Sequence, residues 1–359
     1  MKVVTVVGAR PQFIKAAVVT HKLRKKHTEI LVHTGQHFDE NMSDTFFRQL
    51  DIPNPDYNLG ISGGSHAEMT GKMMIAIEKV LIKEKPDWLL IYGDTNSTLA
   101  GALAAAKLHI NICHVEAGNR THYMTNPEEV NRICSDHISA LLLACTDSCK
   151  ENLIREGLGD KTYVVGDPMF DAFELFSQRI SPDGLELQLL GGGDYKTPRE
   201  YYYLTCHREE NTDRENALSE IFKAMNDFDA PTIYPVHPRN KERAAKLKRE
   251  SGFDNIILTE PVGYFESTAL IRNSKMIVTD SGGVQREAFF AGKKCLTVLD
   301  FAFWPETLNG NRNMLVKPDA EDILQKYSIP QQLDENYQPF GDGHSVDRII
   351  KALEEYRGN

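Results

Sequence analysis

Near-continuous apolar runs recur along the whole chain, separated by segments whose composition suits helices. Among the clearest runs are residues 2–8, 29–35, 88–94, 110–118 and 201–207. Strands buried on both faces of a helix-covered parallel sheet have this pattern, whereas strands of a half-exposed antiparallel sheet alternate apolar and polar residues. The sequence therefore predicts an α/β fold with doubly wound parallel sheets.

The length predicts two domains. At 359 residues, the chain exceeds the roughly 250–300 residues that one core usually serves. The strand–helix alternation pauses over 177–200, the expected linker, which contains glycines and a proline near each end. We expect two Rossmann-like domains facing a central cleft, at 1–170 and 171–344, with a helix over 345–359 that can pack back on the first.

The bulk composition excludes several classes of protein. A formal net charge of −10 argues against a general binder of nucleic acid or of membrane surfaces. No apolar run approaches the roughly 20 residues of a membrane span, and the first run stops at Gly8, so it predicts a strand rather than a signal peptide. The six cysteines lack paired metal-site spacing. We expect a cytoplasmic protein with no metal and no cofactor.

One stretch, "TDSGGVQREAFFAG" at 279–292, predicts a strand, a tight turn and a helix. We expect Gly282 and Gly283 to adopt backbone angles closed to other residues. A helix that begins at Ser281 presents free N–H groups and a positive dipole end, which suits a phosphate. Glu287 lies about one turn further on, where a carboxylate can reach ribose hydroxyls. The stretch therefore predicts a nucleotide-binding turn.

A second anion site is predicted at "GARPQFIK", where Arg10 and Lys15 bracket the start of a helix after the first strand. A guanidinium beside free N–H groups suits phosphate, although a solvated surface pair is the alternative. Neither a G-x-G-x-x-G fingerprint after this strand nor a P-loop motif is present. The sequence therefore argues against a dehydrogenase and a P-loop NTPase.

Acidic side chains follow the strands of the first half. Asp94 and Glu116 each come directly after an apolar run, and Glu128 lies shortly beyond. Because the carboxyl ends of parallel strands meet at one edge of a sheet, we expect these carboxylates to gather there and to suit general acid/base catalysis. The alternative is that Asp94 caps a helix and Glu128 occupies a first helical turn.

In the second half, "HREEN" follows the first strand and "HPRN" the next. His207, with Arg208 and Asn211 beside it, is a candidate donor to a phosphate, and His237 is a second candidate. A histidine at the end of a strand can equally be structural. Together these features predict a sugar-nucleotide enzyme without naming its reaction.

Six motifs resemble the UDP-N-acetylglucosamine 2-epimerase family: "GARPQFIK", "GDTNSTLAGALAA", "HVEAGNRT", "NPEEVNR", "HREEN" and "TDSGGVQREA", which occur in the family's order from residue 2 to about 310. The resemblance implies a GT-B type fold, a homodimer, and a reaction without metal or nicotinamide. UDP leaves C1 as a carboxylate removes the C2 proton, giving a 2-acetamidoglucal, and then adds back. Such an enzyme supplies N-acetylmannosamine-type sugars for surface polysaccharides.

The same resemblance implies roles for individual residues. Asp94, Glu116 and Glu128 match the family's acid/base carboxylates, and His207 matches its histidine near the leaving UDP. The residues expected to bind UDP and the sugar are Arg10, Lys15, Arg132, Arg208, Asn211, His237, Ser281, Gly282, Gly283 and Glu287.

Other segments, such as 33–61 and "VGDPMFDA", are more similar to epimerases of UDP-2,3-diacetamido-2,3-dideoxyglucuronate. Such an acidic sugar would need an extra cation, for which Arg120 and Arg239 are candidates. The chain departs from the family at "LDFAFWPE", where Leu299 and Phe303 stand near the places of an Arg and a Glu. A hydrolysing epimerase, a glycosyltransferase of the same fold and a non-catalytic nucleotide-sugar sensor remain alternatives.

Overall fold

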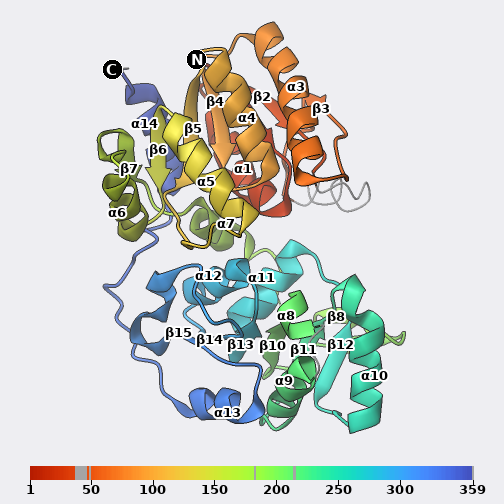
Figure 1. Ribbon diagram of the computed structural model, residues 1–359. Helices are drawn as coiled ribbons and strands as arrows, with labels where there is room; N and C mark the ends of the chain where they lie inside the picture. The colour runs from red at the N-terminus through yellow and green to blue at the C-terminus, as the bar shows by residue number, and fades with distance from the viewer. Residues whose placement is uncertain (37–46, 48–49, 182, 213–215, 358–359) are drawn as a thin grey trace. The chain divides into compact units, whose positions relative to one another are not determined.

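The computed structural model describes residues 1–36, 47, 50–181, 183–212 and 216–357. The chain separates into two compact units (Figure 1): unit 1 comprises Met1–Ala172 with Gln338–Asn359, and unit 2 comprises Phe173–Tyr337. Each unit is built on a parallel sheet, so the predicted α/β fold class is confirmed.

Unit 1 contains, within its described residues, a seven-stranded parallel sheet of order β3-β2-β1-β4-β5-β6-β7. Its strands are β1 (Lys2–Val7), β2 (Thr28–His33), β3 (Tyr57–Asn58), β4 (Trp88–Tyr92), β5 (Asn111–Ala117), β6 (Leu141–Ala144) and β7 (Thr162–Val164). Its helices are α1 (Arg10–Leu23), α3 (His66–Glu84), α4 (Asn96–Lys107), α5 (Pro127–Ile138), α6 (Asp147–Arg155), the 3-10 turn η1 (Gly159–Lys161) and α14 (Ser345–Glu355), with α7 (Pro168–Phe176) crossing the unit boundary.

Unit 2 repeats the plan, with a six-stranded parallel sheet of order β12-β11-β10-β13-β14-β15 among the residues described. Its strands are β10 (Tyr202–Thr205), β11 (Thr232–Pro235), β12 (Ile256–Thr259), β13 (Met276–Thr279), β14 (Lys294–Thr297) and β15 (Asn313–Leu315). Its helices are α8 (Glu209–Thr212), α9 (Ala217–Asn226), α10 (Lys241–Ser251), α11 (Tyr264–Asn273), α12 (Gly282–Phe290) and α13 (Ala320–Ser328), with the 3-10 segments η2 (Pro238–Asn240) and η3 (Pro305–Asn311).

The strand order places the predicted site residues. In each sheet the first strand of the unit pairs on one side with the second and on the other with the fourth: β1 lies between β2 and β4, and β10 between β11 and β13. Ligands of open α/β sheets bind outside the carboxyl ends of strands at such a reversal of order. The turns that follow β1 and β4, and those that follow β10 and β13, therefore hold the positions where chemistry is expected.

Helices cover the sheets because their sequences combine caps with apolar faces. In unit 1, α3, α4 and α5 pack side by side in that order, and α14 packs against α1 (Figure 1). Thr95 caps α4 by accepting a hydrogen bond from the N–H of Thr98, and Asn126 caps α5 by accepting one from the N–H of Glu128. No described helix is long and apolar enough to cross a membrane.

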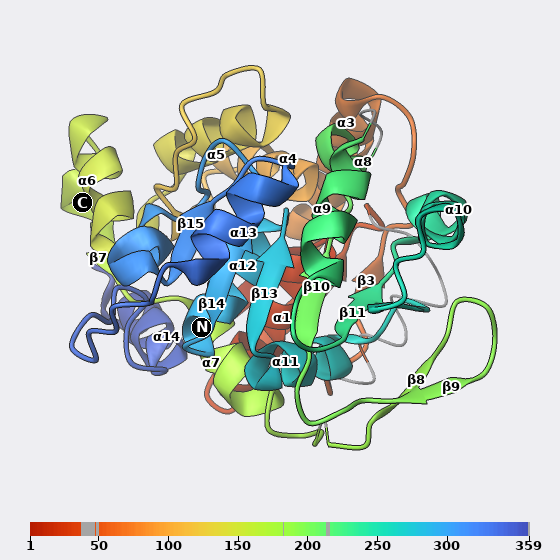
Figure 2. The ribbon, with the colours of Figure 1, turned by 90° about the horizontal axis from the view of Figure 1, so that it is seen from below.

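The segment 177–200 is not the unstructured linker that the sequence predicts. It contains an antiparallel hairpin of β8 (Glu186–Gln188) and β9 (Asp194–Lys196), seen at the margin of Figure 2. Leu187 is buried in the unit 2 core, and the N–H of Glu260 donates to the carbonyl of Gln188 at 2.8 Å. The strands are only three residues long, too short for a period to be read, and their position beside β12 comes from tertiary packing.

Candidate active site

The turn after β1 is shaped by close packing at Gly8. A Cβ atom there would lie 2.2 Å from both the Ser97 and Thr34 hydroxyl oxygens, so a side chain cannot be accommodated. Gln12 accepts a hydrogen bond from the Gly8 N–H at 2.8 Å and donates one to the carbonyl of Tyr92 at 2.8 Å. This amide links the start of α1 to the end of β4, a role that its place in the motif did not reveal.

Lys15 and Glu116 form a buried ion pair at the strand ends. Their Nζ and Oε2 atoms are 2.7 Å apart, and the two side chains are 2% and 10% exposed. Glu116 has a φ of 68° and sits where the β5–β6 register shifts. Such bulges redirect a side chain, and strained backbone concentrates at functional sites. Gly93, at the end of β4, leaves space beside both charged groups.

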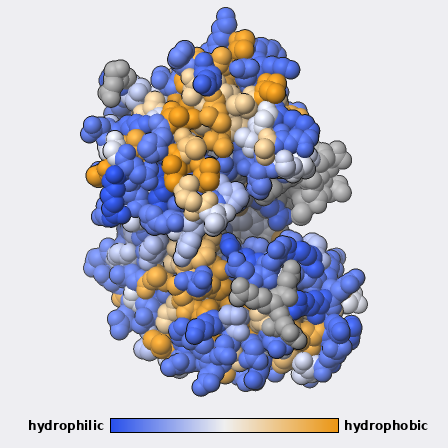
Figure 3. Space-filling view, in the orientation of Figure 1, coloured by the Kyte–Doolittle hydropathy of each residue, from blue (hydrophilic) through white to orange (hydrophobic). Residues whose placement is uncertain are grey.

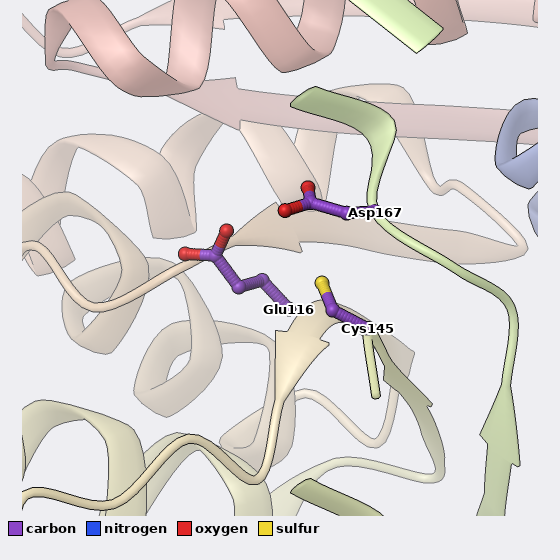
Figure 4. A group of neighbouring side chains, drawn as sticks. All are labelled: Glu116, Cys145 and Asp167. Carbon is purple, nitrogen blue, oxygen red and sulfur yellow. The ribbon is translucent and has the colours of Figure 1, made fainter. Parts of the chain in front are cut away.

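Cys145 and Asp167 complete a buried cluster around Glu116 (Figure 4). One potential ligand atom from each of the three residues lies within 4.8 Å of the other two, and the side chains point toward one another. Carboxylate oxygens and a thiolate can bind a divalent cation, although the Lys15 ammonium already supplies positive charge to Glu116. The three residues lie far apart in the sequence, with no metal-ligand spacing that could have predicted the cluster.

Asp94 is held by Arg132. The Arg132 guanidinium contacts Asp94 Oδ2 at 2.5 Å and Glu129 Oε2 at 2.8 Å, and the Arg132 side chain is 6% exposed while that of Asp94 is 29% exposed. The buried Arg132 thus fixes the position of the Asp94 carboxylate, and the Asp94 side chain remains partly exposed. Thr95, not Asp94, caps α4, so the capping alternative for Asp94 does not apply.

The adjacent acids Glu128 and Glu129 differ in environment. Glu129 is buried and accepts hydrogen bonds from the N–H groups of Thr121 and His122. Burial raises the pKa of Glu129, but these donors and Arg132 outweigh it, so the pKa lies below its usual value. Glu128 is exposed in the first turn of α5. Glu129 therefore holds the loop, whereas Glu128 lies in the first helical turn, as the structural alternative expects, with its side chain exposed.

Arg120, one of the two cations considered for an acidic sugar, has a structural role in unit 1. Its guanidinium contacts Asp136 and Glu156, each at 2.7 Å, and the side chain is 2% exposed. Asp136 Oδ1 also forms a hydrogen bond with His114 Nδ1 at 2.7 Å. The other candidate, Arg239, is exposed and pairs with Glu209 at 3.0 Å. Much of the branch-specific segment 33–61, namely 37–46 and 48–49, lies outside the described residues.

In unit 2, Asp280 organises the turn after β10. It accepts a hydrogen bond from the Arg208 N–H at 2.9 Å, contacts His207 Nδ1 at 2.9 Å, and is held by Asn211. Burial raises the pKa of Asp280, but the hydrogen bonds from His207 and Arg208 outweigh it and lower the pKa. Because Asp280 takes Nδ1, the half-exposed His207 ring presents Nε2 to a ligand. The sequence pattern alone did not indicate this role for the aspartate.

His237 and Asn211 are placed differently from each other. The rings of His237 and His207 lie 6.3 Å apart between centroids, and His237 is exposed. Asn211 is buried and donates to the carbonyl of Val298 at 2.9 Å. The structure thus brings the two histidines together and uses Asn211 to hold the turn.

The glycines of the 279–292 stretch are not in the conformation that the sequence suggests. Ser281 caps α12 by accepting from the Val284 N–H, and Gly282 and Gly283 form its first turn without positive φ. Gly282 is instead needed for close approach, because a Cβ there would lie 2.9 Å from the Phe303 ring. Glu287 is buried one turn further along, and its burial raises its pKa to about 7.

A hollow of about 670 Å³ lies elsewhere in unit 1. It is lined by residues at the amino ends of β6 and β7 and on α14, including Lys161, Tyr163, Arg348 and Tyr356. Within the described chain, none of the site residues predicted from the sequence lines this hollow. It is separate from the strand ends that carry Asp94 and Glu116.

The fold and these strand-end groups define a class: enzymes of GT-B type that act on nucleotide sugars. A profile of the family described as UDP-N-acetylglucosamine 2-epimerase matches residues 21–354. The chain belongs to this family and is a UDP-sugar 2-epimerase by class, as its motifs predict.

Two relatives and one solved structure illustrate the similarity. The chain is 44% identical to the UDP-2,3-diacetamido-2,3-dideoxy-D-glucuronate 2-epimerase of Pseudomonas aeruginosa, covering 98% of this chain and 99% of that protein. It is 41% identical to the UDP-N-acetylglucosamine 2-epimerase of Methanocaldococcus jannaschii, with the same coverage. The crystal structure of the M. jannaschii enzyme in complex with UDP-GlcNAc and UDP matches with a TM-score of 0.85 and 38% identity, over 99% of this chain and 100% of that one.

Proposed function

We propose that this chain is a non-hydrolysing epimerase that interconverts UDP-GlcNAc-type and UDP-ManNAc-type sugars for surface polysaccharide synthesis. The observation that carries the proposal is the placement of Asp94 shortly after β4 and of Glu116 near the carboxyl end of the neighbouring strand β5. Inversion at C2 needs a proton to leave one face of the sugar and arrive on the other. Two carboxylates at adjacent strand ends can divide these tasks.

Unit 2 supports the nucleotide half of this function. The N-terminus of α12 offers N–H groups and a positive dipole to a diphosphate, beside Arg208 and His207 Nε2. Glu287 would accept hydrogen bonds from the ribose hydroxyls. Because negative charge grows on the phosphate as UDP leaves, these donors stabilise the transition state more than the ground state.

The proposed reaction is an elimination followed by an addition, and it needs no oxidant or reductant. A carboxylate takes the C2 proton, the C1–O bond to UDP breaks with its electron pair, and a C1=C2 double bond forms in a 2-acetamidoglucal. UDP oxygen then attacks C1 while a proton is delivered to the other face of C2. Glu116, whose Oε2 lies 2.7 Å from Lys15 Nζ, is one candidate for the carboxylate that takes the proton. Asp94, held by Arg132, and Glu128 are the other candidates.

The test is incubation with UDP-GlcNAc in D2O, with the sugar C2 position followed by NMR. We expect deuterium at C2, a UDP-ManNAc signal, and no accumulation of free UDP. Accumulating UDP with free N-acetylmannosamine would show a hydrolysing enzyme. Tight UDP binding without exchange at C2 of any UDP-sugar would leave the non-catalytic sensor, and turnover only with an added acceptor would show a glycosyltransferase.

A second candidate is epimerisation of UDP-2,3-diacetamido-2,3-dideoxyglucuronate. It is favoured by the 44% identity to the Pseudomonas aeruginosa enzyme of that name. Arg239 is the exposed cation in unit 2 that could meet a sugar carboxylate. Parallel exchange experiments with the two UDP-sugars decide between the candidates, and Arg239→Gln should impair only the reaction of the acidic sugar.

We also propose a homodimer that acts in the cytoplasm. Apolar surface lies over α4 and α5 of unit 1 (Figure 3), and Val130 and Ile138 on α5 are exposed. Exposed apolar patches are typical of protein interfaces. All six cysteines are free thiols, which suits a reducing compartment. Light scattering during gel filtration tests the dimer, which Val130→Lys should weaken.

A further inference from the structure

The loop after β14 packs onto the turn at the start of α12. Its Phe303 ring lies against Gly282, where a Cβ atom would meet three ring or Cβ atoms at 2.9–3.2 Å. Phe301 meets Phe303 edge to face with ring centroids 4.8 Å apart, and Trp304 is buried. The loop therefore places a half-buried aromatic face beside the first turn of α12.

Arg208 lies on that aromatic face. Its Cζ atom is 4.9 Å from the centroid of the Phe303 ring, and its Nε donates to the carbonyl of Asp280 at 2.9 Å. In the described part of the chain, no carboxylate lies within ion-pair distance of the Arg208 guanidinium. A cation near a helix N-terminus is repelled by the positive end of the dipole, and a bound anion would offset this repulsion.

We propose that Phe303 is a positioning residue that holds the Arg208 guanidinium over the N-terminus of α12, ready for the diphosphate of UDP. The Asp280 carbonyl fixes one edge of the guanidinium plane and the Phe303 face fixes its orientation. Gly282 is required because only a residue without Cβ lets the ring approach. This inference rests on the proposed function, since it takes the anion at this turn to be UDP.

The chemistry explains why an aromatic residue serves here. An aromatic face attracts a guanidinium without neutralising it, whereas a carboxylate in this position would form an ion pair and compete with the phosphate. The planar group is thus ordered before the ligand arrives, which reduces the entropy lost on binding. Phe303 would act on affinity for the diphosphate without touching the ligand itself.

The experiment compares Phe303→Leu, Phe303→Tyr and Phe301→Leu, each checked for wild-type folding by circular dichroism. Calorimetry with UDP should show about three- to tenfold weaker binding for Phe303→Leu, as expected for loss of a cation–π contact. Phe303→Tyr keeps the aromatic face and should stay within about twofold of wild type. Phe301→Leu removes a ring that packs against Phe303 but keeps Phe303 itself, so it should weaken UDP binding less than Phe303→Leu does.

Two further readouts separate positioning from general damage. Uridine, which lacks the diphosphate, should bind Phe303→Leu and wild type equally when followed by NMR. In a double-mutant cycle with Arg208→Lys, the two losses in UDP affinity should be non-additive, because Phe303 acts through Arg208.

Unchanged UDP binding by Phe303→Leu, parallel loss of uridine and UDP, or additive losses in the cycle would each overturn the inference. If the wild-type protein does not bind UDP at all, the proposed function itself is overturned. The two failures are therefore distinguishable in one set of titrations.

Discussion

Glu116 has a φ of 68°, a backbone conformation that residues other than glycine rarely adopt, and its side chain is buried beside Lys15. Both features are costly unless the surrounding structure supports them. The bulge in β5, the space left by Gly93 and the ammonium at 2.7 Å provide that support. At the scale of single residues, the structure thus holds one buried carboxylate in an unusual backbone conformation at the end of β5.

Glu116→Gln should lower kcat for epimerisation by about 10²–10⁴-fold, the usual range for loss of an acid/base group. The amide has the same shape but cannot accept the proton, so the KM for the UDP-sugar should change little. Coupled assays and deuterium exchange at C2 measure both effects. Glu78→Gln, on the exposed face of α3, is the matched control. Retention of exchange by Glu116→Gln would remove this residue from the chemistry.

Glu287 predicts a pH-dependent affinity for UDP. Burial raises its pKa to about 7, although Arg286 and a hydrogen bond from Tyr264 oppose the shift. Only the ionised carboxylate accepts two hydroxyl hydrogens, so UDP should bind up to about tenfold more weakly at pH 6 than at pH 8. Calorimetry across this range measures the change. In Glu287→Gln, the phosphate of UDP still titrates but residue 287 does not. If the pH profile of UDP affinity were the same in this variant and in wild type, Glu287 would not be the group responsible.

The same shift has a consequence for stability. Because the folded-state pKa of Glu287 lies above its ordinary value of 4.5, the folded protein binds more protons than the unfolded chain between about pH 4.5 and 7. Its contribution to stability therefore falls as the pH rises through that range. Glu287→Gln should unfold at a higher temperature than wild type at pH 8, with the difference shrinking toward pH 5 in calorimetric scans.

At the scale of elements, the turns after β1 and β4 are joined by contacts too short to tolerate a methyl group at Gly8. Gln12 adds hydrogen bonds from α1 to the end of β4. The helix that carries Arg10 and Lys15 is thereby set relative to the strand that precedes Asp94. The position of this helix is thus set by its packing against neighbouring elements rather than by the helix propensity of its residues.

Gly8→Ala should destabilise unit 1 by about 1–3 kcal/mol or more, the usual cost of overpacking. Gly71→Ala is the matched control, because Gly71 lies inside α3 and an added methyl group there would meet nothing within 4 Å. That change should stabilise the protein by about 0.5–1 kcal/mol through helix propensity. Denaturant unfolding of the two variants, followed by circular dichroism, measures the contrast. Equal stability of the two variants would show that the turn can relax.

At the scale of the whole molecule, unit 1 is assembled from both ends of the chain. Helix α14 lies in unit 1 and packs against α1, and it buries Val346, Ile349 and Leu353. Ser345, at its start, donates its N–H to Asp171 at 2.9 Å. The core of unit 1 is therefore complete only when the last helix has been synthesised.

Ile349→Ala should destabilise unit 1 by about 2–5 kcal/mol, because Ile349 is fully buried and a cavity would remain. The loss should appear in the unfolding transition of unit 1, followed by fluorescence of Trp88, whose ring meets that of Tyr356 edge to face with centroids 4.9 Å apart. Lys351→Ala, on the exposed side of the same helix, should change stability by less than about 0.5 kcal/mol. Similar effects of the two changes would show that α14 does not belong to the unit 1 core.

The amino-acid sequence alone predicts the α/β class, the family and most strands, because buried parallel strands are apolar runs and the strand-end motifs are contiguous. Short elements such as β3, β8, β9 and β15 were missed, since two or three residues have no readable period. Contacts between residues far apart in the sequence could not be predicted either. They are the contact of Asp280 with His207, the ion pair of Arg132 with Asp94, and the cluster of Glu116 with Cys145 and Asp167. Only tertiary structure decides these, because backbone strain, burial and partner choice arise when separate turns meet at the end of a sheet.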